Sequence, residues 1–244
     1  MKRFFKYGSR TGVVLAAILM LTGCLKTSSM YTDFSNPTPL ADISVSNLSG
    51  NNVPNAPDSL TPYALALPVG SQWVDTAIAV HLSDANHVGD VTFTMALANT
   101  DPDFLAMFNY NQQMFTLYND NTAFANLDSA TQVSVTKYVN GFANYTDDNS
   151  GDDVPLGQLT LMPDSLYAFP NGMTVTIPNA GVLNIGDFKV NFKLGATDAD
   201  GNYLFLTHTY VLPIQIADAG GYQIASNFRM IFLVVKIDTT AMGD

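Results

Sequence analysis

Apolar and polar positions alternate strictly along several short stretches of the chain. Residues 91–97 (VTFTMAL) place an apolar side chain at every second position, and residues 188–194 (FKVNFKL) repeat the pattern with two lysines on the polar face. A period of two is typical of a half-buried β-strand. Residues 77–82 and 132–138 are also predicted strands, and residues 203–216 are long enough for one bent strand or two.

Two stretches predict β-hairpins. Residues 166–177 contain Pro170-Asn171-Gly172, in which proline presets one turn position and Asn-Gly supplies positive φ. The predicted strands 211–216 and 230–237 bracket a second turn at residues 218–221 (DAGG). Strands separated by such turns are expected to pair with each other.

One helix is predicted, over residues 101–110. Asp101 or the threonine before it can cap the helix, and Pro102 suits its first turn. Phe104, Met107 and Phe108 fall on one side. The pattern predicts a short helix of two to three turns.

The acidic residues support a fold rich in turns. The chain contains no glutamate, so all 21 acidic residues are aspartates. Aspartate competes for backbone hydrogen bonds and favours caps and turns, whereas glutamate favours helix interiors. About ten short strands with turns between them predict an all-β, two-sheet sandwich with one short helix near residues 101–110. The strands are too short and their polar faces too hydrophilic for a membrane barrel.

The first 24 residues have the layout of a secretory signal that ends in a cysteine. Four basic residues precede an apolar run at residues 12–22, which is shorter than the roughly 20 residues that span a membrane. The run leads into Leu21-Thr22-Gly23-Cys24, which resembles the lipobox of bacterial lipoproteins. The resemblance implies cleavage before Cys24 and a diacylglyceryl group on its thiol. The alternative is a plain secretory peptide with an accidental cysteine.

This pattern predicts the organisation of the chain. Residues 1–23 are the expected signal peptide, and residues 24–60 the lipidated N-terminus, a tether and a candidate edge strand near Ile43. Residues 61–238 are the expected sandwich domain and residues 239–244 a tail. Leu25 follows the cysteine where an aspartate would mark retention at the inner membrane. The expected location is therefore the outer membrane, on either its periplasmic or its external side.

The net charge of the chain limits its partners. The chain has 10 basic and 21 acidic residues, and four of the basic ones lie in residues 1–23. The remaining part has a formal net charge of −15. Such a body repels nucleic acid and anionic membrane surfaces. Its expected contact with the membrane is the lipid on Cys24, and its other expected partner is a glycan or an envelope protein.

The C-terminal half resembles a known family. The segments concerned are residues 161–167, 175–178, 210–216, 221–227 and 232–236. In this order they are similar to a family of Bacteroidota lipoproteins that share a domain of unknown function. That domain occurs at the N-terminus of endo-β-N-acetylglucosaminidase-type glycosidases and in surface glycan-binding lipoproteins. The resemblance implies an immunoglobulin-like β-sandwich and supplies no catalytic residues.

Catalytic motifs are not evident in the sequence. The three histidines lack the spacing of a zinc site, and Gly-x-Ser-x-Gly and phosphate-binding motifs are absent. The aspartate pairs at 147–148 and 152–153 lie in a Gly/Ser/Asn-rich segment that is typical of a solvated loop. We therefore expect no enzymatic activity and no cofactor.

A weak calcium candidate lies at residues 198–202. Asp198, Asp200 and Asn202 offer oxygen ligands at alternate positions beside a glycine turn. A plain Asp-Gly turn explains the same residues and is favoured.

Aromatic and amide residues gather in an insertion from residue 112 to about 155 and in the turn of helix before it. The candidate ligand-binding residues are Tyr110, Tyr118, Tyr138, Tyr145 and, outside the insertion, Trp73. The alternative is that these rings close the core. The expected function is a non-catalytic outer-membrane lipoprotein that binds glycan within a polysaccharide-uptake system. A structural or adhesive envelope protein acting by protein contacts is the alternative.

Overall fold

The computed structural model describes most of the chain beyond its N-terminal segment. The described residues are 39–43, 60–65, 73–84, 87–143, 145–146, 153–154, 156–179 and 184–237. Every described residue belongs to one compact unit, which begins at Pro39. The expected signal peptide, Cys24 and the expected C-terminal tail all lie outside the described residues.

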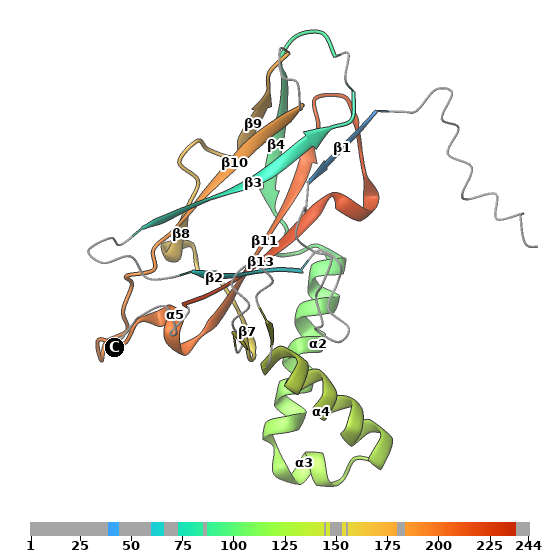
Figure 1. Ribbon diagram of the computed structural model, residues 1–244. Coiled ribbons are helices and arrows are strands. Elements are labelled where there is room, and N and C mark those ends of the chain that lie inside the picture. The colour runs from blue at the N-terminus through green and yellow to red at the C-terminus, as the bar shows by residue number, and fades with distance from the viewer. Residues whose placement is uncertain are drawn as a thin grey trace, which may run out of the picture. The chain divides into compact units, whose positions relative to one another are not determined.

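One sheet, called sheet A, has the strand order β12-β1-β3-β10-β8. Its strands are β1 (Leu40–Ile43), β3 (Val74–Leu82), β8 (Tyr167–Ala168), β10 (Ile185–Phe192) and β12 (Gln223–Ile224). The long pair β3 and β10 runs antiparallel along the middle of the sheet (Figure 1). The strand expected near Ile43 is present as β1, and it pairs antiparallel with β3 and parallel with β12. It therefore lies inside the sheet and is not at its edge.

The other sheet, sheet B, has the order β2-β13-β11-β4-β9, with β7 also paired to β11. Its strands are β2 (Leu60–Leu65), β4 (Val91–Leu97), β7 (Leu159–Leu161), β9 (Thr174–Ile177), β11 (Thr209–Asp218) and β13 (Met230–Ile237). Strands β11 and β13 pair antiparallel, which confirms the second predicted hairpin as a strand pair. Strands β2 and β7 join parallel to their neighbours, so this sheet is mixed.

Alternating apolar side chains from both sheets meet in a first core. Its largest fully buried members from the strands include Phe93, Phe188 and Phe192.

The hairpin predicted at residues 166–177 is wrong, because its two strands do not pair with each other. Its turn forms, with Gly172 at φ 72° and its N–H bonded to the Phe169 carbonyl at 3.0 Å. The strand before the turn, however, joins sheet A, and the strand after it joins sheet B.

The two sheets come close together where β9 passes β10. A Cβ added to Gly186 would lie 2.7 Å from Val175 Cγ2 and 3.1 Å from the Thr176 carbonyl oxygen. A side chain at this position would have to displace the Val175 side chain and shift the Thr176 carbonyl. Glycine at this position therefore permits the close approach.

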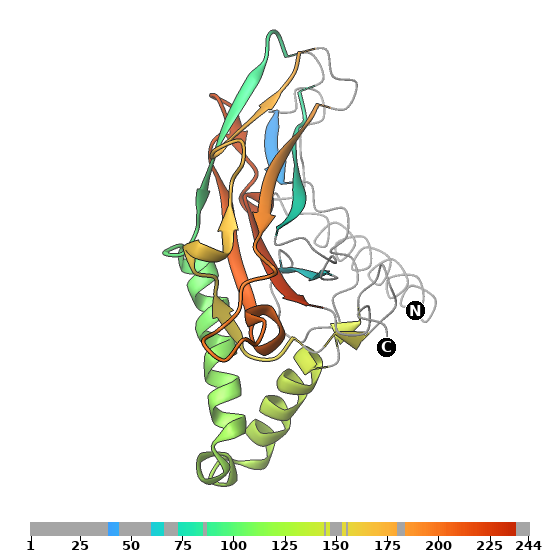
Figure 2. The same cartoon turned by 90° about the vertical axis from the view of Figure 1, so that its left-hand side faces the viewer.

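The helices beside sheet B are α2 (Pro102–Asn119), α3 (Asn121–Ala125) and α4 (Ser129–Ala143). The first part of α2 packs against one end of the outer face of sheet B, and the helices then extend beyond the sheet (Figure 2). Their apolar side chains and those of β7, β11 and β13 form a second core. The second core contains Phe104, Phe115, Tyr138, Phe142, Val211, Phe232 and Val234 together with smaller neighbours. Strands β11 and β13 are thus buried on both faces. The fold therefore consists of sheet A, sheet B and a helical layer that covers part of the outer face of sheet B.

Aspartates begin each of these helices. Asp101 caps α2 by accepting from the Asp103 N–H at 3.0 Å, and Pro102 occupies the first turn, as predicted. Asp120 accepts from the N–H groups of Thr122 and Ala123 at the start of α3. Asp128 accepts from the Thr131 N–H at 3.0 Å, just before α4. None of the helices in the described part of the chain is long and apolar enough to cross a membrane.

The expected all-β, immunoglobulin-like class is wrong, because the described chain is a mixed α/β structure with two mixed sheets and a helical layer. Residues 132–138, predicted as a strand, lie within α4, and the single short helix of the prediction extends to Asn119. Residues 203–216 begin with α5 (Leu204–Thr207) before β11 starts. The remaining short elements are β5 (Tyr145–Thr146), β6 (Asp153–Val154), η1 (Asp164–Leu166) and η2 (Ser226–Phe228).

Candidate functional site

Two consecutive amide side chains on α2 hold the start of β7. Asn111 Oδ1 accepts from the Leu159 N–H at 2.9 Å, and Gln112 Nε2 donates to the Leu159 carbonyl at 2.6 Å. Asn111 is completely buried, so its hydrogen bond forms out of reach of water. Both backbone groups of one residue are therefore fixed to the helix. Because β7 pairs with β11, this clamp also ties α2 to sheet B.

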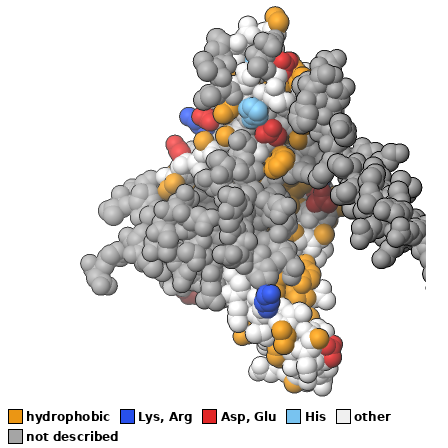
Figure 3. Space-filling model, turned by 45° about the vertical axis from the view of Figure 1, so that its right-hand side comes forward, with side chains coloured by type: hydrophobic (Ala, Val, Ile, Leu, Met, Phe, Trp, Pro, Cys, Tyr) orange, Lys and Arg blue, Asp and Glu red, His pale blue; other side chains and the backbone are white. Residues whose placement is uncertain are grey.

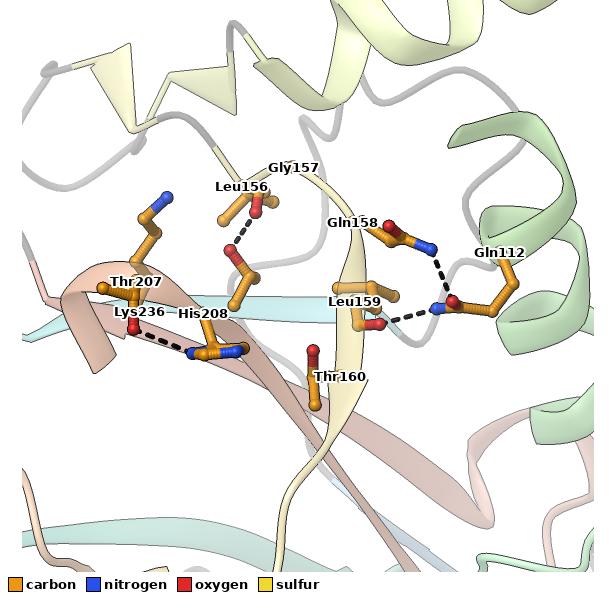
Figure 4. A pocket seen from close by; sticks show the side chains of 10 residues that line it. Gln112, Leu156, Gly157, Gln158, Leu159, Thr160, Thr207, His208 and Lys236 are labelled. Carbon is orange, nitrogen blue, oxygen red and sulfur yellow. Dashed lines mark hydrogen bonds between the residues drawn. The ribbon is translucent and has the colours of Figure 1, made fainter. Parts of the chain in front are cut away.

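The clamp forms one wall of a polar pocket of about 400 Å³ (Figure 4). Gln112 Oε1 also accepts from Gln158 Nε2 at 2.6 Å, and the Thr209 hydroxyl donates to the Leu156 carbonyl. The pocket is lined by Gln112, Leu156, Gly157, Gln158, Leu159, Thr160, Thr207, His208, Thr209 and Lys236. It lies beside strands β7, β11 and β13, at one end of the helical layer.

The wall opposite the two glutamines contains an oriented histidine. The Thr207 hydroxyl donates to the Leu204 carbonyl at 3.2 Å, and His208 Nδ1 lies 2.8 Å from the same hydroxyl oxygen. A hydroxyl has one proton, so when Thr207 donates to Leu204 the Nδ1–H group of His208 is the donor to Thr207. The Nε2 atom, which points away from Thr207 in Figure 4, can then accept a hydrogen bond when the ring is neutral. Stacking on Tyr210, with ring centroids 5.6 Å apart, also orients the ring.

Lys236 adds a cation on the same side of the pocket. By alternation along β13 it lies on the outer face of sheet B, next to the buried Val234. The side chain is half-buried, and this desolvation lowers its pKa from the ordinary value. The ammonium is therefore in a place where a charge is held at a cost.

An ion-pair cluster fixes the N-terminal end of α2 to sheet B. Arg229 donates to both carboxylate oxygens of Asp101, at 2.8 and 3.0 Å, and to Asp103 at 2.7 Å. It also donates to Gln215 Oε1 at 3.0 Å. The hydrogen bond from Arg229 is the main reason that the pKa of Asp101 is lowered. The cluster holds α2 in the position from which Asn111 and Gln112 reach Leu159.

The structure brings two of the tyrosines that the sequence predicted as ligand-binding residues into contact and leaves a third apart from them. Tyr138 is only 1% exposed and packs edge-to-face on Tyr110 at 5.0 Å, and burial raises its pKa. Tyr110 is half-buried beside it. Tyr118 is 38% exposed near the end of α2 and packs against Phe124. The side chain of Tyr145 lies outside the described part.

Trp73 is 41% exposed and directly precedes β3, a strand of sheet A. The tyrosines of α2 and α4 belong to the helical layer, which covers part of the outer face of sheet B. The four predicted residues whose side chains are described therefore do not form one surface. None of these four lines the polar pocket.

The residues of the calcium candidate form a turn that is held by hydrogen bonds to the Asp198 carboxylate. Asp198 Oδ1 accepts from the N–H groups of Asp200 and Asn202, both at 2.9 Å, and Oδ2 accepts from Asn202 Nδ2 at 3.3 Å. These hydrogen bonds lower the pKa of Asp198. Gly201 adopts φ 85°, as the turn alternative requires. Among the described residues, no group of three or more His, Cys, Asp or Glu side chains is placed to hold a metal ion.

Sequence reasoning missed most of the pocket. Gln112 belongs to the predicted aromatic and amide insertion, and His208 falls within the predicted strand region 203–216. Gln158, Thr207 and Lys236 had no signal of their own. They meet only because β7, β11 and β13 are brought together in sheet B.

Comparison with solved structures gives two distant matches, both from Bacteroides ovatus. One is a protein described as a candidate carbohydrate-binding protein, with 11% identity, a TM-score of 0.39, and coverage of 72% of this chain and 35% of the other. The second is a protein of unknown function, with 19% identity, a TM-score of 0.41, and coverage of 81% and 46%. The chain thus spans less than half the length of either protein. No curated protein matches.

The sequence profile of one family covers most of the described domain. The family is described as "-like, N-terminal domain", and the match extends over residues 64–223. This range includes both sheets in large part and the whole helical layer. The chain belongs to this family of N-terminal domains.

Proposed function

We propose that this chain is a non-catalytic, lipid-anchored protein of the bacterial outer membrane that binds glycan as an accessory of a polysaccharide-uptake system. The observation that carries the proposal is the polar pocket beside β7. Its volume of about 400 Å³ lies within the roughly 300–1,000 Å³ of small-molecule sites. Its lining is composed mainly of amide, hydroxyl and imidazole groups. Such a lining suits a polar ligand, because an apolar ligand would need apolar walls.

These groups suit a ligand rich in hydroxyls. A sugar hydroxyl both donates and accepts, and the pocket offers both functions through the amides of Gln112 and Gln158, the Thr160 hydroxyl and His208 Nε2. The internal hydrogen bonds of Gln112 and His208 fix these groups before a ligand arrives, which reduces the entropy lost on binding.

A non-catalytic role fits the same lining. Glycoside hydrolysis ordinarily uses two carboxyl groups about 5–10 Å apart. The described lining of the pocket contains none. The envelope location rests on the lipobox-like segment that ends at Cys24, and the link to glycan uptake rests on the resemblance to Bacteroidota lipoproteins.

The proposal is tested by binding of the purified full chain, in detergent, to a panel of neutral and acidic oligosaccharides. At least one member is expected to bind, and Gln158→Ala and His208→Ala are expected to weaken that binding without lowering the melting temperature. Tyr118→Ala, on the exposed part of α2, is the matched variant for the surface that the sequence predicted. Loss in Tyr118→Ala alone would move the site to the helical layer.

A second candidate function is an envelope protein that acts through protein contacts. Hydrophobic side chains on the surface of the helical layer favour it (Figure 3). Val133 on α4 is 67% exposed and lies in an open groove with Phe124, Gln132, Thr136 and Lys137. A panel on which no glycan binds would favour this function over the first.

A further inference from the structure

The polar pocket lies between two side chains that leave neighbouring strands in opposite directions. Thr209 of β11 and Leu159 of β7 are register partners. The residues directly before them, His208 and Gln158, therefore enter the sheet side by side. His208 turns toward Thr207, whereas Gln158 bonds to a side chain of α2. The space between the two side chains is the pocket (Figure 4).

Internal hydrogen bonds fix which atoms of the two glutamines a ligand meets. The Leu159 carbonyl can only accept, so the nitrogen of the Gln112 amide faces it. The oxygen of that amide accepts from Gln158 Nε2. Gln158 Oε1 is thereby left as an acceptor for a ligand, and each amide nitrogen retains a second N–H. One wall of the pocket therefore offers both an acceptor and donors.

The opposite wall offers a second acceptor. With Nδ1–H directed to Thr207, Nε2 of the neutral His208 ring accepts a hydrogen bond. The Thr160 hydroxyl, which lies between His208 and the glutamines in Figure 4, both donates and accepts. A ligand that uses both walls must carry donors at two separate places. A sugar ring meets this requirement, because it has hydroxyl groups at opposite ends.

The charges around the pocket favour an uncharged sugar over an acidic one. A carboxylate has no hydrogen to donate, so it cannot use Gln158 Oε1 or His208 Nε2. Lys236 already interacts within the protein, and Figure 4 shows its ammonium directed away from the two glutamines. The chain has 21 acidic and 10 basic residues, so its overall field repels anions.

The size and shape of the pocket suit the end of a glycan chain. Its volume of about 400 Å³ is near the lower end of the roughly 300–1,000 Å³ of small-molecule sites. In Figure 4 the lining surrounds this space, with Leu156 and Gly157 opposite Thr160 and the glutamines opposite His208. Such a recess admits one terminal sugar unit, whereas the middle of a polysaccharide needs a groove that is open at both ends.

We infer that the pocket binds the terminal unit of an uncharged glycan, with hydroxyls of that unit bonded to the Gln158 amide and to His208 Nε2. The Thr160 hydroxyl bonds to a third hydroxyl between them. The inference rests on the proposed function and specifies the class of glycan and the part of it that is bound.

The first test uses length series of neutral oligosaccharides, from the dimer to the hexamer. Cello-, malto-, manno- and galacto-oligosaccharides are titrated into the purified full chain in a calorimeter. In each series that binds, the hexamer is expected to bind less than about fivefold more tightly than the dimer, because the pocket contacts only the chain end.

A second test adds a charge to the same ligand. Two acidic forms of the binding dimer are prepared, each with the primary alcohol of one of its units oxidised to a carboxylate. The form that is oxidised at the bound end should bind at least about fivefold more weakly than the neutral dimer, because the carboxylate loses its hydration without a cationic partner. The form oxidised at the other end should bind like the neutral dimer.

Variants identify the contacts. His208→Phe keeps a ring against Tyr210 and removes Nε2, and it should weaken binding at least about fivefold, as should Gln158→Ala. Gln113→Ala, next to Gln112 but exposed and outside the pocket lining, is the matched control and should leave binding unchanged. Melting temperatures of the three variants separate a binding effect from a folding effect, and Gln158→Ala remains informative if His208→Phe is unstable.

The outcomes are distinct. The inference would be overturned, with glycan binding intact, by a hexamer that gains more than about fivefold over the dimer or by acidic forms that both bind as well as the neutral dimer. Binding of acidic sugars alone, or full binding by a folded His208→Phe or Gln158→Ala variant, would overturn it equally. Absence of binding by every sugar, neutral or acidic, would overturn both the inference and the proposed function.

Discussion

At the scale of single residues, the candidate site depends on one buried amide. The buried Asn111 accepts a hydrogen bond from the Leu159 N–H within the second core. The half-buried Gln112 completes the clamp by donating to the Leu159 carbonyl. A backbone N–H that loses its partner in such a place keeps the full cost of desolvation, because water cannot replace the lost bond.

Asn111→Ala should therefore lower the free energy of unfolding by about 1–3 kcal/mol. Asn109→Ala, on the exposed side of the same helix, is the matched control and should change it by less than about 0.5 kcal/mol. Urea unfolding at neutral pH measures both. Equal losses in the two variants would mean that the clamp contributes no stability of its own.

The pair of Asp101 and Arg229 gives a pH-dependent expectation. The folded state lowers the pKa of Asp101 below 3.8, chiefly through the hydrogen bond from Arg229. A lowered carboxyl pKa adds stability that is fully present above the ordinary pKa and is lost as the pH falls through the lowered value. Asp101→Asn keeps a capping side chain and removes the charge.

Asp101→Asn should thus be less stable than the parent by about 1–2 kcal/mol at pH 7, and the difference should shrink as the pH falls below 3.8. Thermal unfolding across pH 2–7 measures it. Arg229→Met should show a similar loss at pH 7, and the double variant should lose less than the sum, because the two residues share one interaction. Additive losses would contradict the pairing.

Individual residues differed in how far the sequence could place them. Asp101 and Pro102 were predicted correctly, since a cap and a first-turn proline act within a few residues of chain. Tyr138 was predicted as a ligand-binding residue and is buried, because its surroundings depend on which element α4 packs against. Lys236 could not be foreseen in a pocket whose walls come from residues up to 124 positions away.

At the scale of elements, the helical layer had two signals in the sequence. Residues 209–216 and 230–235 are almost continuously apolar, the pattern of strands covered on both faces. Val135, Tyr138, Val139 and Phe142 recur at the spacing of one helix face. The β-branched residues around them favoured a strand by propensity, and tertiary packing overrode that preference.

Phe142 tests the helical layer as an element. It lies on α4, is completely buried and packs against Phe115 of α2, so Phe142→Ala should lower the free energy of unfolding by about 3–5 kcal/mol. Val133→Ala, on the exposed side of the same helix, should change it by less than about 0.5 kcal/mol. Chemical unfolding followed by circular dichroism at 222 nm measures both. A small loss in Phe142→Ala would mean that α4 is only loosely attached.

At the scale of the whole molecule, the strands were predicted better than their partners. Residues 91–97 form β4 as expected, and the segment around 188–194 lies largely in β10. The hairpin around Gly172 was wrong because a turn fixes only the reversal of the chain. Which sheet receives each strand depends on contacts with distant residues, such as Gly186 against Val175.

The membrane anchor is also a property of the whole molecule, and it remains a prediction. Cys24→Ser should abolish labelling of the protein by radioactive palmitate and leave the precursor at its unprocessed size, because the thiol is the expected attachment point. Ser28→Ala, four residues further on, is the matched control and should keep both the label and the processing. Labelling and gel mobility measure this, and full labelling of Cys24→Ser would exclude a lipid on that thiol.

The position of β13 has a consequence for how the protein is made. This strand lies between β2 and β11 and contributes side chains to both cores, yet it is the final element of the described fold. A nascent chain that has not yet emerged past residue 237 lacks the middle of sheet B. Neither core can close before then, so the domain stays unable to fold until β13 has been synthesised.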